Sequence, residues 1–357
     1  MTRRLGRALI GIPVLLGLSG ASVPIVAARS ITPPAMTEGN PACPALRWTT
    51  LGTAGGPVAT PERAQPANLL EADGGYYLVD SGDGAANQLA RAGLNLGSIR
   101  GVFISHHHHD HTGGLSAVIG LRWMNQFPGV LTIYGPPGTR AMVDGIVAAL
   151  EPQARVGFGL GQADRPPAAS VAVIELRGGS ALTLGGLKVD VAANSHFDHP
   201  GPVEADPPQS LSLRFSLGAR SITYTGDTGP SPAVASLARE TDMLVSEVID
   251  LERIVSDIRQ HRPDASPQMM DQMEQHLSAH HLKPADVGSM AQAAGVRHLV
   301  LTHFAVPGAL VDSAANLRAG VRQSYSGPLD LARDLASYDV GCRRTSDARP
   351  PSRGAER

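Results

Sequence analysis

Residues 106–111 of this chain read His-His-His-His-Asp-His and directly follow an apolar run at 101–105. The run predicts a buried β-strand, and the Thr-Gly-Gly that follows the histidines lets the backbone turn sharply into a helix. Residues just past a strand end can aim at one point from different sides, because side chains alternate between the two faces of a strand. The fold must therefore gather several imidazoles and a carboxylate at one place.

The residue types in this segment indicate ligands for two metal ions. Imidazole nitrogens bind Zn, Fe or Mn, and a carboxylate extends the choice toward harder ions. His106 and His108 share one parity and can bind one ion together, whereas Asp110 and His111 lie further round the loop and can bind a second. A purification tag is the alternative, but a tag does not follow a buried strand or carry an aspartate before its last histidine.

Two ions need more ligands than this segment holds, and three further polar residues follow apolar runs. His196 comes after the run 189–193, Asp227 after 222–225, and His303 after 299–301. Proteins of the α/β class place their sites at such strand ends. A lone histidine there is usually structural, but three such residues beside a histidine cluster favour one shared site. His199 competes with His196, although it lies three residues further from the strand end.

Composition limits the protein class. The chain has 357 residues, of which 42% are hydrophobic, enough for one large domain or two small ones. Glycine (40) and proline (28) are abundant and aromatic residues are 4%, which favours a loop-rich α/β protein. The net charge of −2 provides no basic field that would hold a long nucleic acid by its phosphates. We therefore expect no nucleic-acid partner.

Hydrophobic patterning divides the chain into two similar halves of strands and helices. Strands are predicted at 46–51, 68–71, 76–79, 101–105, 131–134, 171–176, 187–193, 210–216, 221–225, 243–247 and 298–302. Helices are predicted at 85–92, 115–126, 138–150, 232–238, across 251–295 and at 312–324. Grouped strands with helices outside them predict an α/β fold of the αβ/βα sandwich type, two mixed β-sheets packed together with helices on both outer faces.

The N-terminal segment is predicted to lie outside the fold. Residues 1–28 combine an arginine-containing head, an apolar stretch and a small-residue exit, which is typical of a signal peptide. The alternative is an uncleaved membrane anchor. A lead-in segment at 29–45, one domain at 46–340 and a disordered polar tail at 341–357 follow. The expected location is periplasmic or secreted.

The sequence has two cysteines, Cys43 and Cys342, near opposite ends of the exported chain. In an oxidising compartment they can pair and join the termini. Two free buried thiols are the alternative, because sequence does not measure the distance between them.

Several motifs in order make the chain resemble the metallo-β-lactamase superfamily, and within it the ribonuclease Z and arylsulfatase branch. The resemblance covers about residues 48–305 and is carried by Leu-Gly-Thr-Ala-Gly-Gly-Pro at 51–57, Val-Asp-Ser-Gly-Asp-Gly at 79–84, the histidine cluster, Leu-Thr-Ile-Tyr-Gly-Pro-Pro-Gly at 131–138, Gly-Asp-Thr at 226–228 and Leu-Thr-His-Phe at 301–304. It implies an αβ/βα sandwich with a dinuclear metal site at its edge.

The resemblance also implies roles for individual residues. The first metal ion is held by His106, His108 and His196, the second by Asp110, His111 and His303, and both by a bridging Asp227. The ions are expected to be two Zn²⁺ per chain, with Mn²⁺ or Fe²⁺ as alternatives.

Three residues are expected to serve catalysis. His281 falls where the ribonuclease Z branch keeps a catalytic histidine and is the candidate proton donor, with His280 as its adjacent competitor. Asp110, or Asp227, can accept the proton of the attacking water, and Asp80 matches a strand-end aspartate that orients the ligands.

Neighbouring polar residues receive weaker interpretations. His107 and His109 occupy variable positions of the cluster and are expected to lie beside the site. Glu247 is expected either to support the ligands from behind or to be structural, and the preceding Ser246 departs from the histidine that the related branch carries there.

The expected activity is that of an exported dinuclear-metal hydrolase, which uses a metal-activated hydroxide on a small phosphodiester or aryl sulfate ester. Position 227 is aspartate and neither cysteine lies near a ligand motif, so β-lactam chemistry is not indicated. Residues 151–180 lack the long basic arm of tRNA-processing members, which favours a small-molecule substrate. The alternatives are a lactonase or other hydrolase, including a dehalogenating one, of aromatic small molecules, and a non-catalytic metal-binding protein.

Other interactions follow from the same features. A membrane is a partner only if the N-terminal segment stays uncleaved, and the sequence is compatible with a homodimer. Residues 250–279 look long for this branch and place methionines 269, 270 and 273 in a helical setting. We interpret them either as a helix pair that covers the core or as a lid with an apolar wall.

Overall fold

The computed structural model describes residues 43, 45–156, 165–199 and 207–341. The predicted signal peptide at 1–28, most of the lead-in and nearly all of the tail lie outside these residues. Within the described ranges, no helix is both long and apolar enough to span a bilayer. Cys43 forms a disulfide bond, and Cys342, the other cysteine of the sequence, lies outside the described residues.

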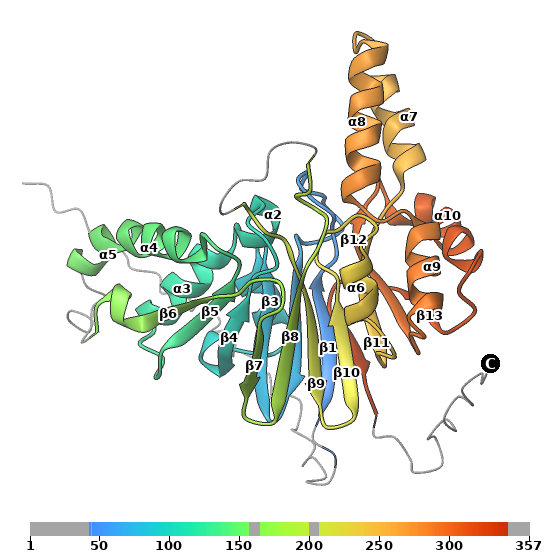
Figure 1. Cartoon of the computed structure of the whole chain (residues 1–357). Coiled ribbons are helices and arrows are strands. Elements are labelled where there is room, and N and C mark those ends of the chain that lie inside the picture. The colour runs from blue at the N-terminus through green and yellow to red at the C-terminus, as the bar shows by residue number, and fades with distance from the viewer. Residues whose placement is uncertain (1–42, 44, 157–164, 200–206, 342–357) are drawn as a thin grey trace, which may run out of the picture. The chain divides into compact units, whose positions relative to one another are not determined.

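Two mixed sheets of seven strands each form the framework (Figure 1). The first sheet has the strand order β14 (Ala336–Asp339), β1 (Leu46–Gly52), β2 (Ala67–Ala72), β3 (Gly75–Ser81), β4 (Ile99–Phe103), β5 (Leu131–Gly135) and β6 (Val171–Glu175). The second has the order β13 (Leu329–Leu331), β12 (Leu299–Ala305), β11 (Met243–Ile249), β10 (Arg220–Tyr224), β9 (Leu211–Leu217), β8 (Leu187–Ala193) and β7 (Ala181–Leu184).

Within each sheet, the strands that lead to the predicted site residues run in the same direction. In the first sheet β3, β4, β5 and β6 are parallel neighbours. In the second sheet β10, β11 and β12 are parallel, and β8 runs with them because it is antiparallel to β9, which is antiparallel to β10. The carboxyl ends of these strands therefore meet at one edge of each sheet, where α/β folds collect functional side chains.

The main core lies between the sheets and continues under the helices of the second sheet. Trp48 and Phe103 of the first sheet contact Phe215 of the second, with ring centroids 6.1 Å and 5.3 Å from it. A second apolar cluster joins the other face of the first sheet to its helices, which include Leu89 and Trp123. Burial of both faces explains why the central strands read as continuous apolar runs.

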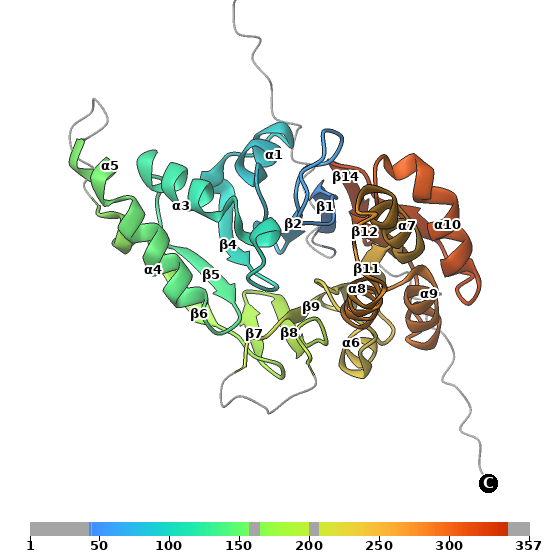
Figure 2. The ribbon, with the colours of Figure 1, turned by 90° about the horizontal axis from the view of Figure 1, so that it is seen from above.

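Helices cover the outer faces of both sheets, as predicted (Figure 2). Those beside the first sheet are α1 (Ala85–Arg91), α3 (Leu115–Met124), α4 (Thr139–Ala149) and α5 (Glu151–Val156). Those beside the second are α6 (Pro232–Leu237), α9 (Pro284–Ala293) and α10 (Leu310–Arg322). Short helices are α2 (His109–Thr112) and the 3-10 turns η1 (Leu96–Ser98) and η2 (Pro167–Ser170). The predicted αβ/βα sandwich is confirmed.

The sequence analysis missed three short strands, β7, β13 and β14. Each lies at the edge of a sheet and has an incomplete burial pattern, so its hydrophobic signal is weak. β14 completes the first sheet from the far end of the chain by pairing antiparallel with β1. That pairing is non-local, and no short window of sequence encodes it.

Residues 251–280 form a hairpin of α7 (Leu251–His261) and α8 (Pro267–His280), which stands above the sheet edge in Figure 1. The hairpin has its own apolar cluster, which includes Leu251, Val255 and Met270 with the partly buried Met273. The same cluster contains Ile249 of β11 and the partly buried Ala305 of β12, so the hairpin also packs against these two strands. The interpretation that the helix pair covers the core stays a prediction. Met269 is exposed, so the methionines do not form one apolar wall.

Candidate metal centre

Four side chains converge on a first candidate metal position. Nδ1 of His108 lies 3.1 Å from Nε2 of His106 and 3.1 Å from Nε2 of His196. Oδ2 of Asp227 lies 3.9 Å from Nε2 of both His106 and His196. Three nitrogens and one carboxylate oxygen around a common point are a suitable donor set for a borderline ion such as Zn²⁺.

The other oxygen of the same aspartate faces a second position. Oδ1 of Asp227 lies 3.3 Å from Nε2 of His111 and 3.2 Å from Nε2 of His303. Oδ2 of Asp110 lies 3.5 Å from each of these two nitrogens. Asp227 thus directs one oxygen into each group, which is the arrangement expected of a bridging carboxylate.

Unsatisfied polar atoms support a cation at the second position. Nε2 of His111, Nε2 of His303 and Oδ1 of Asp227 are buried and have no hydrogen-bond partner among the described residues. Buried polar atoms without partners are costly, so their convergence calls for a ligand. The residues present therefore fit a divalent ion at each position.

Strand ends supply most of these side chains. His106 and His108 follow β4, Asp110 and His111 lie on α2, His196 follows β8, and Asp227 follows β10. His303 was expected to follow the end of a strand, but it lies within β12, which continues to Ala305.

His303 reaches the cluster through a β-bulge. Between the pairs Ser246–Leu301 and Val248–Phe304, one residue of β11, Glu247, opposes two residues of β12. His303 has φ 44°, which is left-handed for a non-glycine residue. Asp80, with φ 58°, lies at a similar register shift in β3. Bulges re-aim side chains, and strained backbone persists where the surrounding structure requires it.

Hydrogen bonds behind the histidines fix which ring nitrogen faces the centre. Nδ1 of His111 donates to Oδ2 of Asp80 over 2.8 Å. Nδ1 of His196 donates to the backbone carbonyl of His280 over 2.9 Å. In the neutral form of each ring, Nε2 then has the free lone pair that a metal ligand needs.

Electrostatics favour ionised carboxylates in the centre. Burial alone would raise the pKa of Asp110, but its hydrogen bond to His303 and the charges of His111 and His303 lower it to about 2. The pKa of Asp227 is held well below its ordinary value against the same effect of burial, by His303 and His111. Burial lowers the pKa of His196 to about 4, so this ring is neutral at pH 7 and free to bind a cation.

His281 and Glu247 form a pair at the margin of the cluster. Nδ1 of His281 lies 2.8 Å from Oε2 of Glu247. A nitrogen of His281 and ligand atoms of His196 and Asp227 lie within 4.8 Å of one another. Burial would lower the pKa of His281, but the charge and hydrogen bond of Glu247 raise it to about 9. Glu247 is fully buried, and its pKa is raised by that burial.

The remaining histidines are placed away from the two positions. Nε2 of His107 lies 2.9 Å from Oγ1 of Thr139, toward α4. The His280 ring bonds to the backbone carbonyl of Ser195 over 3.2 Å, whereas His281 faces the cluster. His109 and His199 are exposed and join none of the candidate metal groups found among the described residues.

A family model described as a beta-lactamase superfamily domain matches residues 76–304, well over half of the chain. The chain belongs to the metallo-β-lactamase superfamily. Ribonuclease Z of Mycobacterium bovis is 29% identical over 303 residues, which cover 84% of this chain and 100% of that protein. Ribonuclease Z of Mycolicibacterium paratuberculosis is 30% identical over 299 residues, which cover 83% and 98%. The resemblance to the ribonuclease Z branch is confirmed.

Solved structures show the same superfamily fold. The metallo-β-lactamase fold protein YhfI from Bacillus subtilis has a TM-score of 0.59 and 20% identity, over 83% of this chain and 100% of that chain. The short form of human tRNase Z has a TM-score of 0.56 and 21% identity, over 83% and 100%. At these identities the likeness establishes the fold.

The relatives overturn one expectation. The exclusion of nucleic-acid partners is contradicted, because relatives that are 29–30% identical over more than four fifths of the chain are named ribonuclease Z. Net charge is an average over the whole chain and does not describe the local field at one site, so it does not exclude binding of a nucleic acid.

Two contacts at this site were not predicted from the sequence. The Phe197 ring lies against the rings of His106, His108 and His196, with centroids 5.6, 5.1 and 5.0 Å away. A Cβ at Gly56 would lie 1.8 Å from Oδ2 of Asp110, so only glycine allows this approach. The signals were present: Phe197 follows His196 directly, and Gly56 lies in the Gly-Gly of the 51–57 motif.

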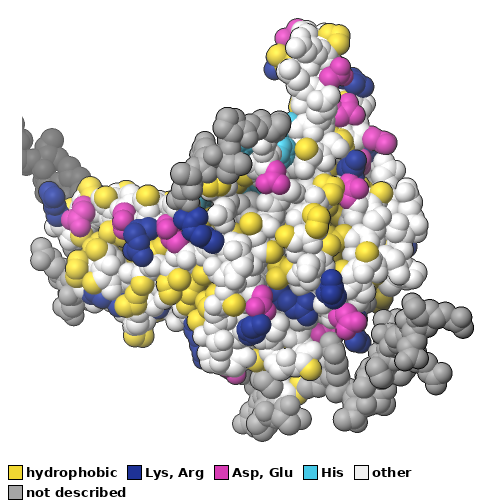
Figure 3. All heavy atoms as spheres, viewed as in Figure 1, with side chains coloured by type: hydrophobic (Ala, Val, Ile, Leu, Met, Phe, Trp, Pro, Cys, Tyr) yellow, Lys and Arg dark blue, Asp and Glu magenta, His cyan; other side chains and the backbone are white. Residues whose placement is uncertain are grey.

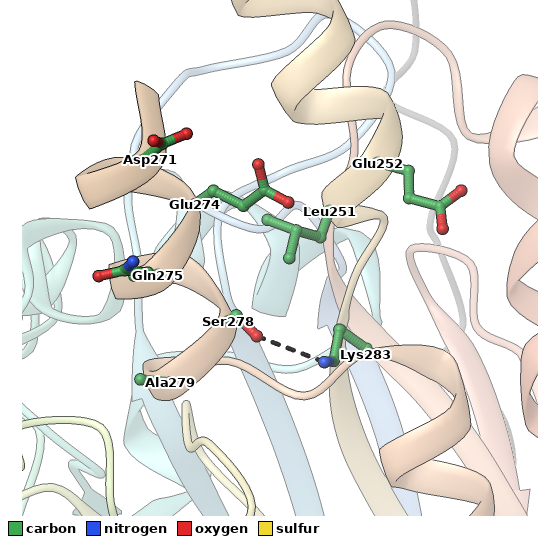
Figure 4. Close-up of a pocket in the computed structure, with 8 residues that line it drawn as sticks. All are labelled: Leu251, Glu252, Asp271, Glu274, Gln275, Ser278, Ala279 and Lys283. Carbon is green, nitrogen blue, oxygen red and sulfur yellow. Dashed lines mark hydrogen bonds between the residues drawn. The ribbon is translucent and has the colours of Figure 1, made fainter. Parts of the chain in front are cut away.

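A separate hollow of about 720 Å³ lies at the base of the α7–α8 hairpin (Figure 4). Its lining includes Glu252, Asp271 and Glu274 with a single cation, Lys283. Three carboxylates disfavour an anionic ligand. None of the candidate metal ligands lines this hollow. Histidine side chains instead come to the surface at the foot of the hairpin (Figure 3).

Proposed function

We propose that this protein is a two-metal hydrolase of phosphodiester bonds. The observation that carries the proposal is Asp227, whose two oxygens each face a separate group of candidate ligands. Two such positions a short distance apart suit displacement at phosphorus, where both the attacking and the leaving oxygen need stabilisation. The ribonuclease Z relatives support the choice of a phosphodiester.

The proposed ligands are those named from the sequence. The first ion is assigned to His106, His108 and His196, the second to Asp110, His111 and His303, and Asp227 is shared. When bound, two divalent ions such as Zn²⁺ lower the pKa of a water molecule and neutralise charge that develops at the attacked centre.

The chain's own groups handle the protons. Asp110 is ionised at neutral pH, since its pKa is lowered to about 2, and can accept a proton from the attacking water. His281 is protonated at neutral pH and can donate to the leaving oxygen. Glu247 keeps His281 charged and oriented through the 2.8 Å hydrogen bond. Asp80 orients the ring of His111 from behind.

The substrate range is the finer part of the proposal. A small phosphodiester and an RNA phosphodiester present the same reacting group, so the centre alone does not separate them. We propose export on the basis of the N-terminal sequence, and an exported enzyme would meet substrates outside the cytoplasm. A direct comparison of turnover on small phosphodiesters and on RNA is therefore needed to distinguish the two substrate types.

The test is a panel of a bis-aryl phosphate, an aryl sulfate, an aryl lactone and a precursor tRNA, run on zinc-loaded and manganese-loaded protein. We expect phosphodiester turnover that a chelator abolishes and added metal restores. His108→Ala and Asp227→Ala should each lose at least about 100-fold of this turnover. His107→Ala is the matched control, because its ring faces Thr139. Full activity of both variants would show that the site assignment is wrong, and lactone turnover alone would replace the proposed reaction.

A further inference from the structure

One buried carboxylate is hydrogen-bonded to a residue of the second candidate metal position and is connected to the first position through Ser105. Asp80 is fully buried and accepts hydrogen bonds at both oxygens. Oδ1 accepts from the backbone N–H of Ser105 over 2.7 Å. Oδ2 accepts from Oγ of Ser105 over 2.9 Å, from Nδ1 of His111 over 2.8 Å and from the Tyr224 hydroxyl over 2.8 Å. Four donors therefore reach this carboxylate, one at Oδ1 and three at Oδ2.

The Ser105 hydroxyl extends this network to the other metal position. Oγ of Ser105 lies 3.0 Å from Nδ1 of His106. A hydroxyl has a single proton, and in this arrangement Ser105 gives it to Asp80. The oxygen must then accept from His106, which requires the proton of the neutral ring to be on Nδ1. Nε2 of His106, the nitrogen near His108 and Asp227, is left with a free lone pair.

We propose that Ser105 is a positioning residue that transmits the orienting effect of Asp80 to His106. Asp80 then sets the tautomer of one histidine at each position: His111 directly, and His106 through the serine hydroxyl. The proposal rests on the metal assignments of the proposed function. It adds that the first position depends on Ser105 and the second does not.

The packing around Ser105 leaves little freedom for another arrangement. Ser105 and His106 are both fully buried. The backbone carbonyl of Ser105 accepts from the N–H of Leu211 over 2.9 Å, which ties it to the second sheet. Its side chain lies against Gly226, where an added Cβ would come within 3.0 Å of the Ser105 Cβ. In the wild-type protein there is therefore no room for a water molecule beside the Ser105 hydroxyl.

The chain provides a matched control for deletion of this hydroxyl. Ser81 is also buried, follows Asp80 directly, and its Oγ has no hydrogen-bond partner among the described residues. Ser105→Ala and Ser81→Ala remove the same atom from the same region. Only the first interrupts the path from Asp80 to His106.

The experiment is a titration of the full chain with cadmium-113 ions, followed by cadmium NMR. The two positions should give separate resonances, because one has three nitrogen donors and the other two. We expect Ser105→Ala to weaken binding at the first position by about 10–100-fold and to leave the second within about threefold. Ser81→Ala should match the wild type at both positions, and Ser105→Thr, which keeps a hydroxyl, should recover most of the loss.

A second measurement does not depend on any variant folding. In the metal-free wild-type protein, nitrogen NMR should show the His106 proton on Nδ1. A proton on Nε2, or equal binding of both ions by Ser105→Ala and the wild type, would overturn the role of Ser105 alone. Failure of the wild type to bind cadmium at either position would overturn the proposed function together with this inference.

Discussion

Nδ1 of His281 lies 2.8 Å from Oε2 of Glu247, and each of these two residues also offers a ligand atom to a candidate metal group that contains Asp227. His281 comes from the end of the hairpin helix α8, and Glu247 from β11, opposite the bulge in β12. The hairpin and the second sheet are therefore joined beside the candidate reaction centre.

The pair predicts an unusual titration in the metal-free protein. Glu247 raises the pKa of His281 to about 9, so NMR of the imidazole should show a midpoint there and Glu247→Gln should lower it by more than one unit. Because the folded pKa is above the ordinary 6.5, the pair stabilises the fold fully below pH 6.5, and this stabilisation is lost as the pH rises through about 9. Glu274→Gln, on the exposed side of α8, should leave the titration unchanged. A wild-type midpoint near 6.5 would contradict the prediction.

Gly56 predicts a steric test of the second position. A methyl group there would meet the carboxylate of Asp110, so Gly56→Ala should displace that group and reduce metal-dependent turnover at least about tenfold with the fold retained. Gly145 lies in α4 with nothing within 4 Å of its added Cβ. Gly145→Ala should keep full turnover and stabilise the protein by about 0.5–1 kcal/mol. Turnover and circular dichroism of both variants check this, and equal activity would show that Asp110 tolerates displacement.

The Tyr224 hydroxyl predicts a stability effect. It donates to Asp80 in a buried site, and hydrogen bonds to charged groups contribute about 1.5–3 kcal/mol. Tyr224→Phe should lower the free energy of unfolding by about that amount. Tyr338→Phe is the control, because that hydroxyl belongs to a half-buried edge strand. Denaturant unfolding measures both, and no difference between them would remove Tyr224 from the Asp80 network.

Two adjacent methionines predict that the hairpin is stabilised independently. Met270 is 6% exposed in the hairpin cluster, whereas Met269 is 54% exposed. Met270→Ala should destabilise the hairpin by about 2–5 kcal/mol, and Met269→Ala should change stability by less than about 0.5 kcal/mol. Hydrogen exchange should then accelerate in α7 and α8 of the first variant alone, with the central strands unchanged. Faster exchange throughout the second sheet would mean that the hairpin and the body unfold together.

Much of the fold was predictable because its signal is local. Central strands such as β4 and β10 are buried on both faces and read as continuous apolar runs, so their positions needed no tertiary information. Edge strands such as β14 were missed, because they take their stability from a partner almost 300 residues away. The boundary of β12 was predicted too early for a similar reason: the bulge at His303 continues the strand where the apolar run ends.

The candidate site divides in the same way. Chain order alone predicted that His106, His108, Asp110 and His111 lie together, because they are close in sequence and follow one strand. It did not show that the two oxygens of Asp227 face different groups, that Glu247 pairs with His281, or that Asp80 reaches His106 through Ser105. These relationships join residues from β3, β4, β10, β11 and α8, and depend on how the two sheets meet. Residue type and spacing determine which ligand and proton-transfer groups the chain has, whereas packing determines which of their atoms come within contact distance.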